Sequence, residues 1–245
     1  MQNPINLVMQ LPRRALFSYR SIVSQEPACW FLYQPYIWHG QRKLKAAGVS
    51  PQERIVSSAT QLVIDGFPGS ANSFAALAFK RSQKQYINLA HHLHSPSQIL
   101  QAIEREIPVL LTIREPVGAI LSIASRRPYI TATQGLHTYI GFYSKLKPYS
   151  SHYVISTFEQ STQHLDRMIA RVNTVFNTNF DLVDIAKANA DRQTKKAQRD
   201  SEKLAIRESI REEKRQEFTL EKNAQLLIQA KALYQAYEEL AHQRQ

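Results

Sequence analysis

The chain has 245 residues, 43% of them apolar, and its 31 Lys and Arg outnumber its 20 Asp and Glu, which gives a formal net charge of +11. This apolar content is enough to bury one substantial core, and no apolar run approaches the roughly 20 residues of a membrane-spanning helix. The basic charge suits an anionic ligand, a membrane surface or nucleic acid, whereas the single cysteine, Cys29, excludes an internal disulfide framework and favours a cytoplasmic location.

The first 60 residues predict a basic helical extension packed beside the core. Two helical patches, LPRRALFSYR (11–20) and HGQRKLK (39–45), flank an aromatic stretch. Solvated helices are the simpler interpretation of this pattern. The alternative is a surface that touches anionic lipid or an anionic polymer. Basic residues only follow the first apolar stretch, so no secretory signal is predicted.

From residue 61 onward, strand and helix signals alternate. The run PVLLTI is apolar throughout, as expected for a parallel strand that is buried on both faces. The alternation predicts an α/β fold over residues 61–184: a three-layer sandwich with a mainly parallel, P-loop-like sheet. The predicted strands are 61–65, 85–90, 108–113 and 153–156, and the predicted helices are 72–80, one opened by residues 95–97, 116–125, 134–146 and 163–176.

Residues 185–245 predict charged C-terminal helices. Residues 185–222 are dense in Lys, Arg, Glu and Gln and contain neither Gly nor Pro. Residues 224–241 regain an apolar stripe at helical spacing. We therefore expect a solvated helix or a lid, followed by a helix that docks back on the core.

The turn after the first predicted strand is a place where phosphates bind, because free backbone N–H groups and the helix dipole point there. Residues 66–74 read GFPGSANSF. Gly66 and Ser73 fit the ATP-binding pattern of glycine, four residues, glycine, lysine and Ser or Thr, but Ala71 and Asn72 replace the second glycine and the lysine. The missing lysine argues against a kinase or an ATPase. An ordinary strand–helix turn is the alternative interpretation.

The segment FPGSANSF (67–74) resembles the 5'-phosphosulfate loop of the sulfotransferase family, whose pattern runs aromatic, Pro, Lys or Arg, Ser, Gly, Thr, Thr, aromatic. Ala71 and Asn72 depart from that pattern, and Gly69 stands where the family has a basic residue. In the family this cation stabilises charge on the bridging oxygen as the sulfuryl group leaves. The resemblance therefore implies either a replacement cation or a site that binds without efficient catalysis.

Arg114 and Ser122 extend the resemblance. Sulfotransferases carry an arginine at the end of the third strand and a serine eight residues later, and both contact the 3'-phosphate of the donor. A strand-end guanidinium offers a bidentate fork, and a serine two turns into the helix adds a hydroxyl. The resemblance covers about residues 60–180 and is closest to bacterial sulfotransferase-like proteins. It implies 3'-phosphoadenosine 5'-phosphosulfate (PAPS) as the donor co-substrate and no metal.

Three histidines, His91, His92 and His94, follow the second predicted strand. Cytosolic-type sulfotransferases carry a catalytic histidine here, in a His-Leu-Pro context, which takes the proton of the acceptor hydroxyl. His92-Leu93 matches that pair most directly, so the resemblance implies His92 as the base and His91 as the second choice. His94 matches the histidine-to-proline relation differently. A metal site and a structural cluster are the alternatives.

The leading hypothesis is thus transfer of a sulfuryl group from PAPS to a hydroxyl or amine acceptor. One alternative is a catalytically impaired protein that binds PAPS or its desulfated product PAP, and another is an interaction module whose basic helices bind a partner or an anionic surface. Nucleic-acid binding is not expected, because no recognised motif organises the charge. The implied catalytic residues are His92 and His91, and the implied donor-binding residues are Gly69, Ser70, Ala71, Asn72, Ser73, Phe74, Arg114 and Ser122.

Overall fold

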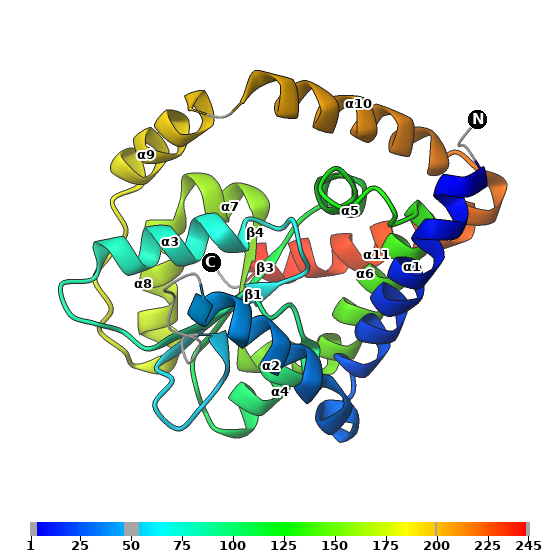
Figure 1. Cartoon of the computed structure of the whole chain (residues 1–245). Helices are drawn as coiled ribbons and strands as arrows, with labels where there is room; N and C mark the ends of the chain where they lie inside the picture. The colour runs from blue at the N-terminus through cyan, green and yellow to red at the C-terminus, as the bar shows by residue number, and fades with distance from the viewer. Residues whose placement is uncertain (1–3, 47–53, 199, 244–245) are drawn as a thin grey trace.

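The computed structural model describes residues 4–46, 54–198 and 200–243. Within them, four parallel strands form one sheet in the order β2-β1-β3-β4, which confirms the predicted α/β class (Figure 1). The all-parallel arrangement agrees with the apolar character of the central strands, which are buried on both faces. The strands are β1 (Leu62–Gly66), β2 (Leu89–His91), β3 (Val109–Ile113) and β4 (Val154–Thr157).

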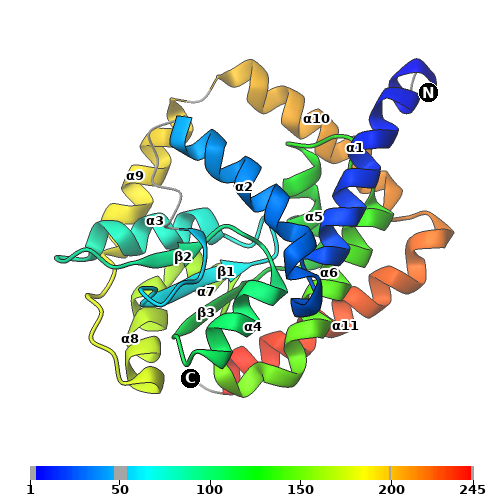
Figure 2. The ribbon, with the colours of Figure 1, turned by 60° about the horizontal axis from the view of Figure 1, so that its bottom comes forward.

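Helices cover both faces of the sheet, so the three-layer arrangement is also confirmed (Figures 1 and 2). In β1 the buried side chains alternate: Leu62 and Ile64 belong to the core on one face, and Val63 to the core on the other. The helices of the first face are α3 (Asn72–Ser82) and α8 (Leu165–Phe176), and those of the second are α4 (Pro96–Glu104), α6 (Ala132–Leu146) and α11 (Glu221–Gln243).

The edge strand β2 is shorter than predicted and lies further along the chain. The prediction covered residues 85–90, whereas the strand begins at Leu89, which is the residue that pairs with Leu62 at the start of β1. Gln85 and Tyr86 are exposed and lie before this register. The predicted segment therefore includes residues that precede the strand. An edge strand extends only over the residues that form hydrogen bonds with the neighbouring strand, here β1.

Local capping explains two helix starts. Glu115 accepts hydrogen bonds from two free N–H groups in the first turn of α5 (Pro116–Ala124), at 2.8 and 3.0 Å. Thr131 and Gln134 form a capping box, so α6 starts at residue 132 rather than at the predicted 134. The predicted helix 163–176 is likewise preceded by a separate short helix, α7 (Phe158–Gln163).

Two N-terminal helices lie beside the core, α1 (Pro4–Val23) against α6 and α2 (Trp30–Ala46) against α1, with the short 3-10 turn Pro27–Cys29 between them. A second 3-10 segment, Lys147–His152, connects α6 to β4. None of the described helices combines the length and the apolar character that a bilayer crossing requires.

The C-terminal helices form an arch and then close the core (Figure 1). In the arch, α9 (Ile185–Ala197) lies against α3 and α7, and α10 (Ser201–Glu217) lies against α5. The following helix, α11, buries its apolar stripe beside β4 and α6, where Tyr237 donates a hydrogen bond to the carbonyl of Tyr143 at 2.8 Å. The last segment is therefore part of the core.

Candidate functional site

The loop between β1 and α3 carries backbone N–H groups that make no hydrogen bond within the described residues. Its backbone turns through positive φ at Gly69 (+96°) and Ala71 (+70°). In the described part of the chain, no oxygen accepts a hydrogen bond from the N–H groups of Gly69, Ala71, Asn72 or Ser73. The N-terminus of α3 adds its partial positive charge. Unpaired N–H groups that converge at a helix start can bind a phosphate or sulfate group.

The side chains of Asn72 and Ser70, which were expected to contact the donor nucleotide, instead point into the protein and stabilise the loop. Asn72 donates to the carbonyl oxygens of Gly66 (3.2 Å) and of the next residue (3.0 Å), and its own oxygen accepts from the hydroxyl of Thr112. Ser70 is fully buried with its hydroxyl 3.4 Å from that of Tyr143. At both positions the loop therefore offers a ligand its backbone, while the side chain fixes the loop.

Gly69, Arg114 and Ser122, which are far apart in sequence, come together on one side of this loop. Arg114 Nη1 donates to the carbonyl oxygen of Gly69 at 3.2 Å. A Cβ atom at Gly69 would lie 2.7 Å from the carbonyl oxygen of Ala119 and 3.1 Å from Cβ of Ser122. The loop thus rests directly on α5. A lysine or arginine at position 69 would collide with that helix, in a backbone conformation that favours glycine.

The Arg114 guanidinium is half-buried and lies 4.1 Å above the ring of Phe158. Burial lowers the pKa of Arg114, while the nearby Glu115 and Glu159 act in the opposite direction. Arg211 of α10 and Arg192 of α9 are close enough to lower that pKa further. The arch therefore adds positive charge to the site, which favours an anionic ligand.

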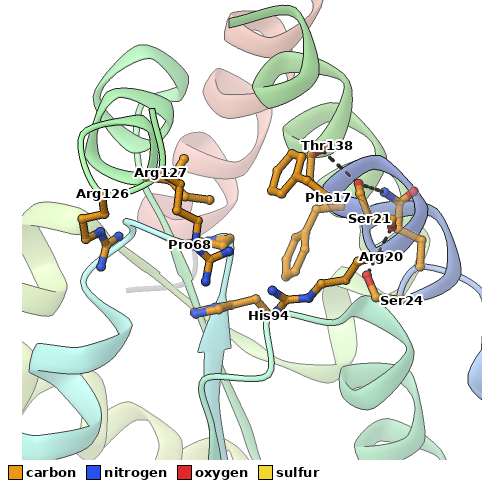
Figure 3. A pocket seen from close by; sticks show the side chains of 12 residues that line it. Phe17, Arg20, Ser21, Ser24, Pro68, His94, Arg126, Arg127 and Thr138 are labelled. Atoms are coloured by element: carbon orange, nitrogen blue, oxygen red, sulfur yellow. Dashed lines mark hydrogen bonds between the residues drawn. The ribbon is translucent and has the colours of Figure 1, made fainter. Parts of the chain in front are cut away.

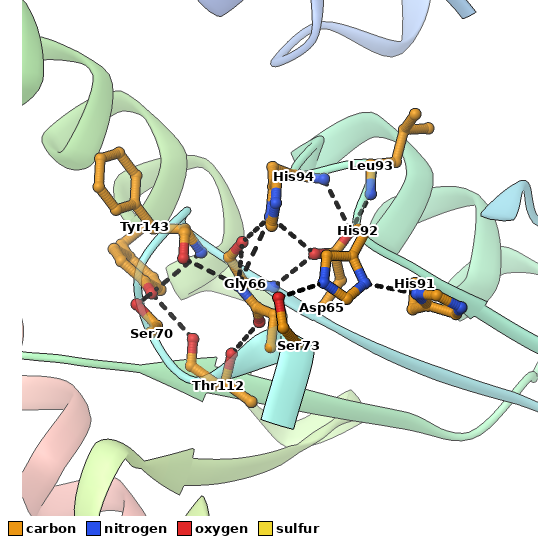
Figure 4. Close-up of polar contacts among 12 residues, drawn as sticks. Asp65, Gly66, Ser70, Ser73, His91, His92, Leu93, His94, Thr112 and Tyr143 are labelled. Carbon is orange, nitrogen blue, oxygen red and sulfur yellow. Dashed lines mark hydrogen bonds and ion pairs between the residues drawn. The ribbon is translucent and has the colours of Figure 1, made fainter. Parts of the chain in front are cut away.

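A buried carboxylate organises the histidine segment (Figure 4). Asp65, at the end of β1, accepts hydrogen bonds from the backbone N–H groups of Gly66, Leu93 and His94 at 2.8–3.0 Å. The Nδ1 atom of His94 lies 3.1 Å from the same carboxylate and 2.8 Å from the carbonyl oxygen of Gly66. Burial acts to raise the pKa of Asp65, but His94 and the N–H donors outweigh it and hold the pKa below its ordinary value.

The hydrogen bonds of His94 determine its tautomer. A ring nitrogen that faces a carbonyl oxygen and a carboxylate carries the proton, so Nδ1 is the donor and Nε2 is left with its lone pair. Among the described residues, no partner contacts Nε2. His94 therefore has the geometry of a base that a buried acid orients.

His92 and His91, the histidines implied as catalytic, are occupied by other contacts. His92 Nε2 lies 2.6 Å from the hydroxyl of Ser73, and its Nδ1 meets Nδ1 of His91. Burial, with a contribution from the charge of His92, lowers the pKa of His91 to about 3. Burial, with a contribution from His94, lowers the pKa of His92 to about 4. Both rings are neutral at physiological pH, and their nitrogens hold one another and the start of α3.

These two histidines predict an acid-sensitive fold. The unfolded chain takes up protons at its histidines below pH 6.5, whereas His91 and His92 in the folded state do so only near pH 3 and 4. The free energy of unfolding should therefore fall as the pH drops from 6.5 towards 4, by about 1.4 kcal/mol per pH unit for each histidine. Urea unfolding at pH 7.5, 6 and 5 measures this slope. The slope should flatten in His91→Asn and His92→Asn but not in the exposed control His39→Gln; equal slopes in all four proteins would contradict the expectation.

Two cavities flank the loop. The first, of about 160 Å³, is lined on the loop side by Pro68 and His94 (Figure 3). The second is a groove of about 730 Å³ between α3 and α9, lined by Ser73 and Phe74. Arg192 lies over the Phe74 ring in this groove, 5.3 Å from the ring centre. The groove has the size of a nucleotide site, whereas the first cavity has room for one small group.

Asp65 and the cavity-lining arginine of α1, Arg20, were not identified as site residues from the sequence. Asp65 could have been identified, because an acidic residue at the end of a buried strand, directly before a Gly-rich turn, requires a hydrogen-bonding or charged partner. No sequence pattern points to Arg20, because its place beside His94 depends on how α1 packs on the core. Within the described residues, no group of three or more His, Cys, Asp or Glu side chains is placed to hold a metal ion.

Comparisons with protein-family models, with curated proteins and with solved structures gave no match to this chain.

Proposed function

We propose that this chain binds PAPS at the loop after β1 and transfers its sulfuryl group to a hydroxyl or amine acceptor in the cytoplasm. One observation carries the proposal: a loop with four N–H groups that make no hydrogen bond within the described residues is contacted at Gly69 by Arg114 and rests there on Ser122. The end of the same loop, at Ser73 and Phe74, lines a groove of nucleotide size. Backbone donors and a half-buried guanidinium are the groups that hold phosphate and sulfate oxygens in proteins. The sequence resemblance to the sulfotransferase loop points in the same direction.

His94 is the base in this proposal, in place of His92. Its Nε2 lone pair accepts the proton of the acceptor, and the proton on Nδ1 stays there, hydrogen-bonded to Asp65 and to the Gly66 carbonyl oxygen. The buried carboxylate then stabilises the imidazolium that forms, because its negative charge lies 3.1 Å from Nδ1. His92 and His91 have the positioning role of holding the turn that carries His94.

The donor supplies an activated sulfuryl group, and the chain supplies the hydrogen-bond donors and positive charges that bind the nucleotide. The loop N–H groups bind the oxygens at the 5' end, and Arg114 and Ser122 bind the 3'-phosphate. Position 69 offers no cation to the leaving oxygen, so the positive charge at the site comes from Arg114 and from Arg192 and Arg211 of the arch.

Gly69 favours a second candidate function, binding of the nucleotide without turnover. Its contact with α5 excludes the cation that the family places at this position. The impaired protein would retain the product PAP and leave PAPS intact. Turnover assays distinguish the two functions once nucleotide binding has been established.

The test is calorimetric titration with PAP and with adenosine 5'-phosphate, which lacks the 3'-phosphate. We expect micromolar binding of PAP and clearly weaker binding of adenosine 5'-phosphate. Arg114→Ala should lower the PAP affinity about 10–100-fold, which corresponds to one charge-assisted contact. This variant should bind PAP and adenosine 5'-phosphate with nearly equal affinity. The matched control is Arg105→Ala, at the exposed end of α4. A folded wild-type protein that binds neither nucleotide would refute the proposal.

A further inference from the structure

The small cavity beside His94 is lined by basic, apolar and neutral polar side chains. It lies between α1, the loop after β1 and the helices α5 and α6 (Figure 3). Arg20, Arg126 and Arg127 line it together with His94, and its lining residues, all within the described part of the chain, include no carboxylate. Phe17 and other apolar side chains form part of the remaining wall. The rest is formed by neutral polar residues: Ser21, Ser24, Gln25 and Thr138. Because like charges in a concave site reinforce one another, this cavity is a place of strongly positive potential.

The three guanidinium groups are held to different degrees. Arg20 donates to the Tyr33 hydroxyl at 3.3 Å and lies over the Tyr36 ring, 4.0 Å from its centre. Arg126 donates to the carbonyl oxygen of Ser122 at 3.1 Å. For Arg127, no hydrogen bond or ion pair of the guanidinium exists among the described residues. Figure 3 shows Arg127 directed into the cavity, towards His94. Its guanidinium is thus available to an incoming anion.

We propose that this cavity binds the carboxylate of a small aromatic acceptor and so selects anionic acceptors. The inference rests on the proposed function for the reaction, but binding of the anion stands on the cavity alone. A volume of about 160 Å³ suits one six-membered ring, since a cavity of about 150 Å³ takes up benzene. Phe17 and Phe142 supply apolar surface for the ring, and Arg127 with Arg20 supplies donors for the carboxylate.

The same placement brings the acceptor to the proposed base. Pro68 and His94 line the loop side of the cavity, so an acceptor that occupies it lies next to His94. The Nε2 atom of His94 accepts the hydroxyl proton as the oxygen attacks sulfur. The oxygen–sulfur bond forms while the bond from sulfur to the bridging oxygen of the donor breaks, and PAP leaves with the electron pair.

The experiment compares 4-hydroxybenzoate with 4-hydroxybenzamide, which has nearly the same shape and no charge. Each compound is titrated into the whole wild-type protein, with binding followed by calorimetry or ligand-observed NMR. We expect 4-hydroxybenzoate to bind at least about 10-fold more tightly than the amide. Arg127→Gln should lower the 4-hydroxybenzoate affinity by a similar factor and leave the amide unchanged. The control Arg105→Gln removes the same charge at the exposed end of α4 and should change neither affinity.

The outcomes separate this inference from the proposed function, because PAP is titrated in parallel. Binding of PAP with equal or undetectable binding of the two ring compounds would overturn the anionic acceptor and leave the nucleotide site intact. Preferential binding of 4-hydroxybenzoate without PAP binding would support the anion cavity and refute the sulfotransferase function. The wild-type comparison needs no variant, so it remains decisive even if Arg127→Gln fails to fold.

Discussion

Replacement of Asp65 by asparagine should lower the free energy of unfolding by about 3–5 kcal/mol, the largest loss that we expect from any single polar substitution in this chain. The carboxylate is fully buried and accepts from three backbone N–H groups and from His94. An asparagine amide directs its own NH2 group at one of these donors and provides no charge for them. Several donors would then be left buried without an acceptor.

Thermal and urea unfolding of Asp65→Asn measure this loss, and a decrease of about 10 °C in Tm is the corresponding shift for a chain of this size. The matched control is Glu104→Gln, at the exposed end of α4, which removes one negative charge and should change stability by less than about 0.5 kcal/mol. The double variant with His94→Gln then separates two contributions to the free energy of unfolding, that of the Asp65–His94 ion pair and that of the backbone N–H donors. If Asp65→Asn were as stable as Glu104→Gln, the organising role of Asp65 would be wrong.

Replacement of Gly69 by lysine, the residue type that sulfotransferases carry at the matching loop position, should impair the site rather than improve it. The new Cβ would lie 2.7 Å from the Ala119 carbonyl oxygen, in a backbone conformation at φ +96° that side chains rarely adopt. Strain and overlap together should cost about 2–4 kcal/mol of folding stability. PAP affinity should fall as well, because the loop moves away from Arg114 and Ser122.

Gly69→Ala provides the matched comparison, since it adds the Cβ atom without the ammonium group. We expect both variants to lose nearly the same stability in urea unfolding and to bind PAP more weakly in calorimetry. A Gly69→Lys protein as stable as the wild type and faster in sulfuryl transfer would show that the loop can carry a cation and that our account of this glycine is wrong.

The central part of the fold could be predicted from the sequence because the strands there are fully apolar. The run PVLLTI and the short run before Gly66 became β3 and β1, which lie in the middle of the sheet with both faces covered. The edge strand β2 was misplaced by several residues, since only pairing with β1 determines where it begins. The start of α6 depended on a capping box that the apolar pattern does not record.

The site was predictable only in part. The proximity of Gly69, Arg114 and Ser122 follows from the order of parallel strands, whose carboxyl ends meet at one edge of the sheet. The choice among three neighbouring histidines was not predictable, because it depends on which ring reaches the buried Asp65 when the backbone has positive φ at both His92 and His94. The inward turn of Asn72 likewise depends on Thr112, forty residues away in sequence.

The packing of α11 also has a consequence for biosynthesis. During translation, the sheet, the loop and Arg114 leave the ribosome well before the helix that covers the second face of the sheet. Tyr237 meets Tyr143 across 94 residues, and such long-range contacts form slowly. Until they form, the nascent chain exposes the apolar faces of α6 and β4, which are prone to associate with other chains. Fast or crowded synthesis should therefore increase the dependence of this protein on chaperones.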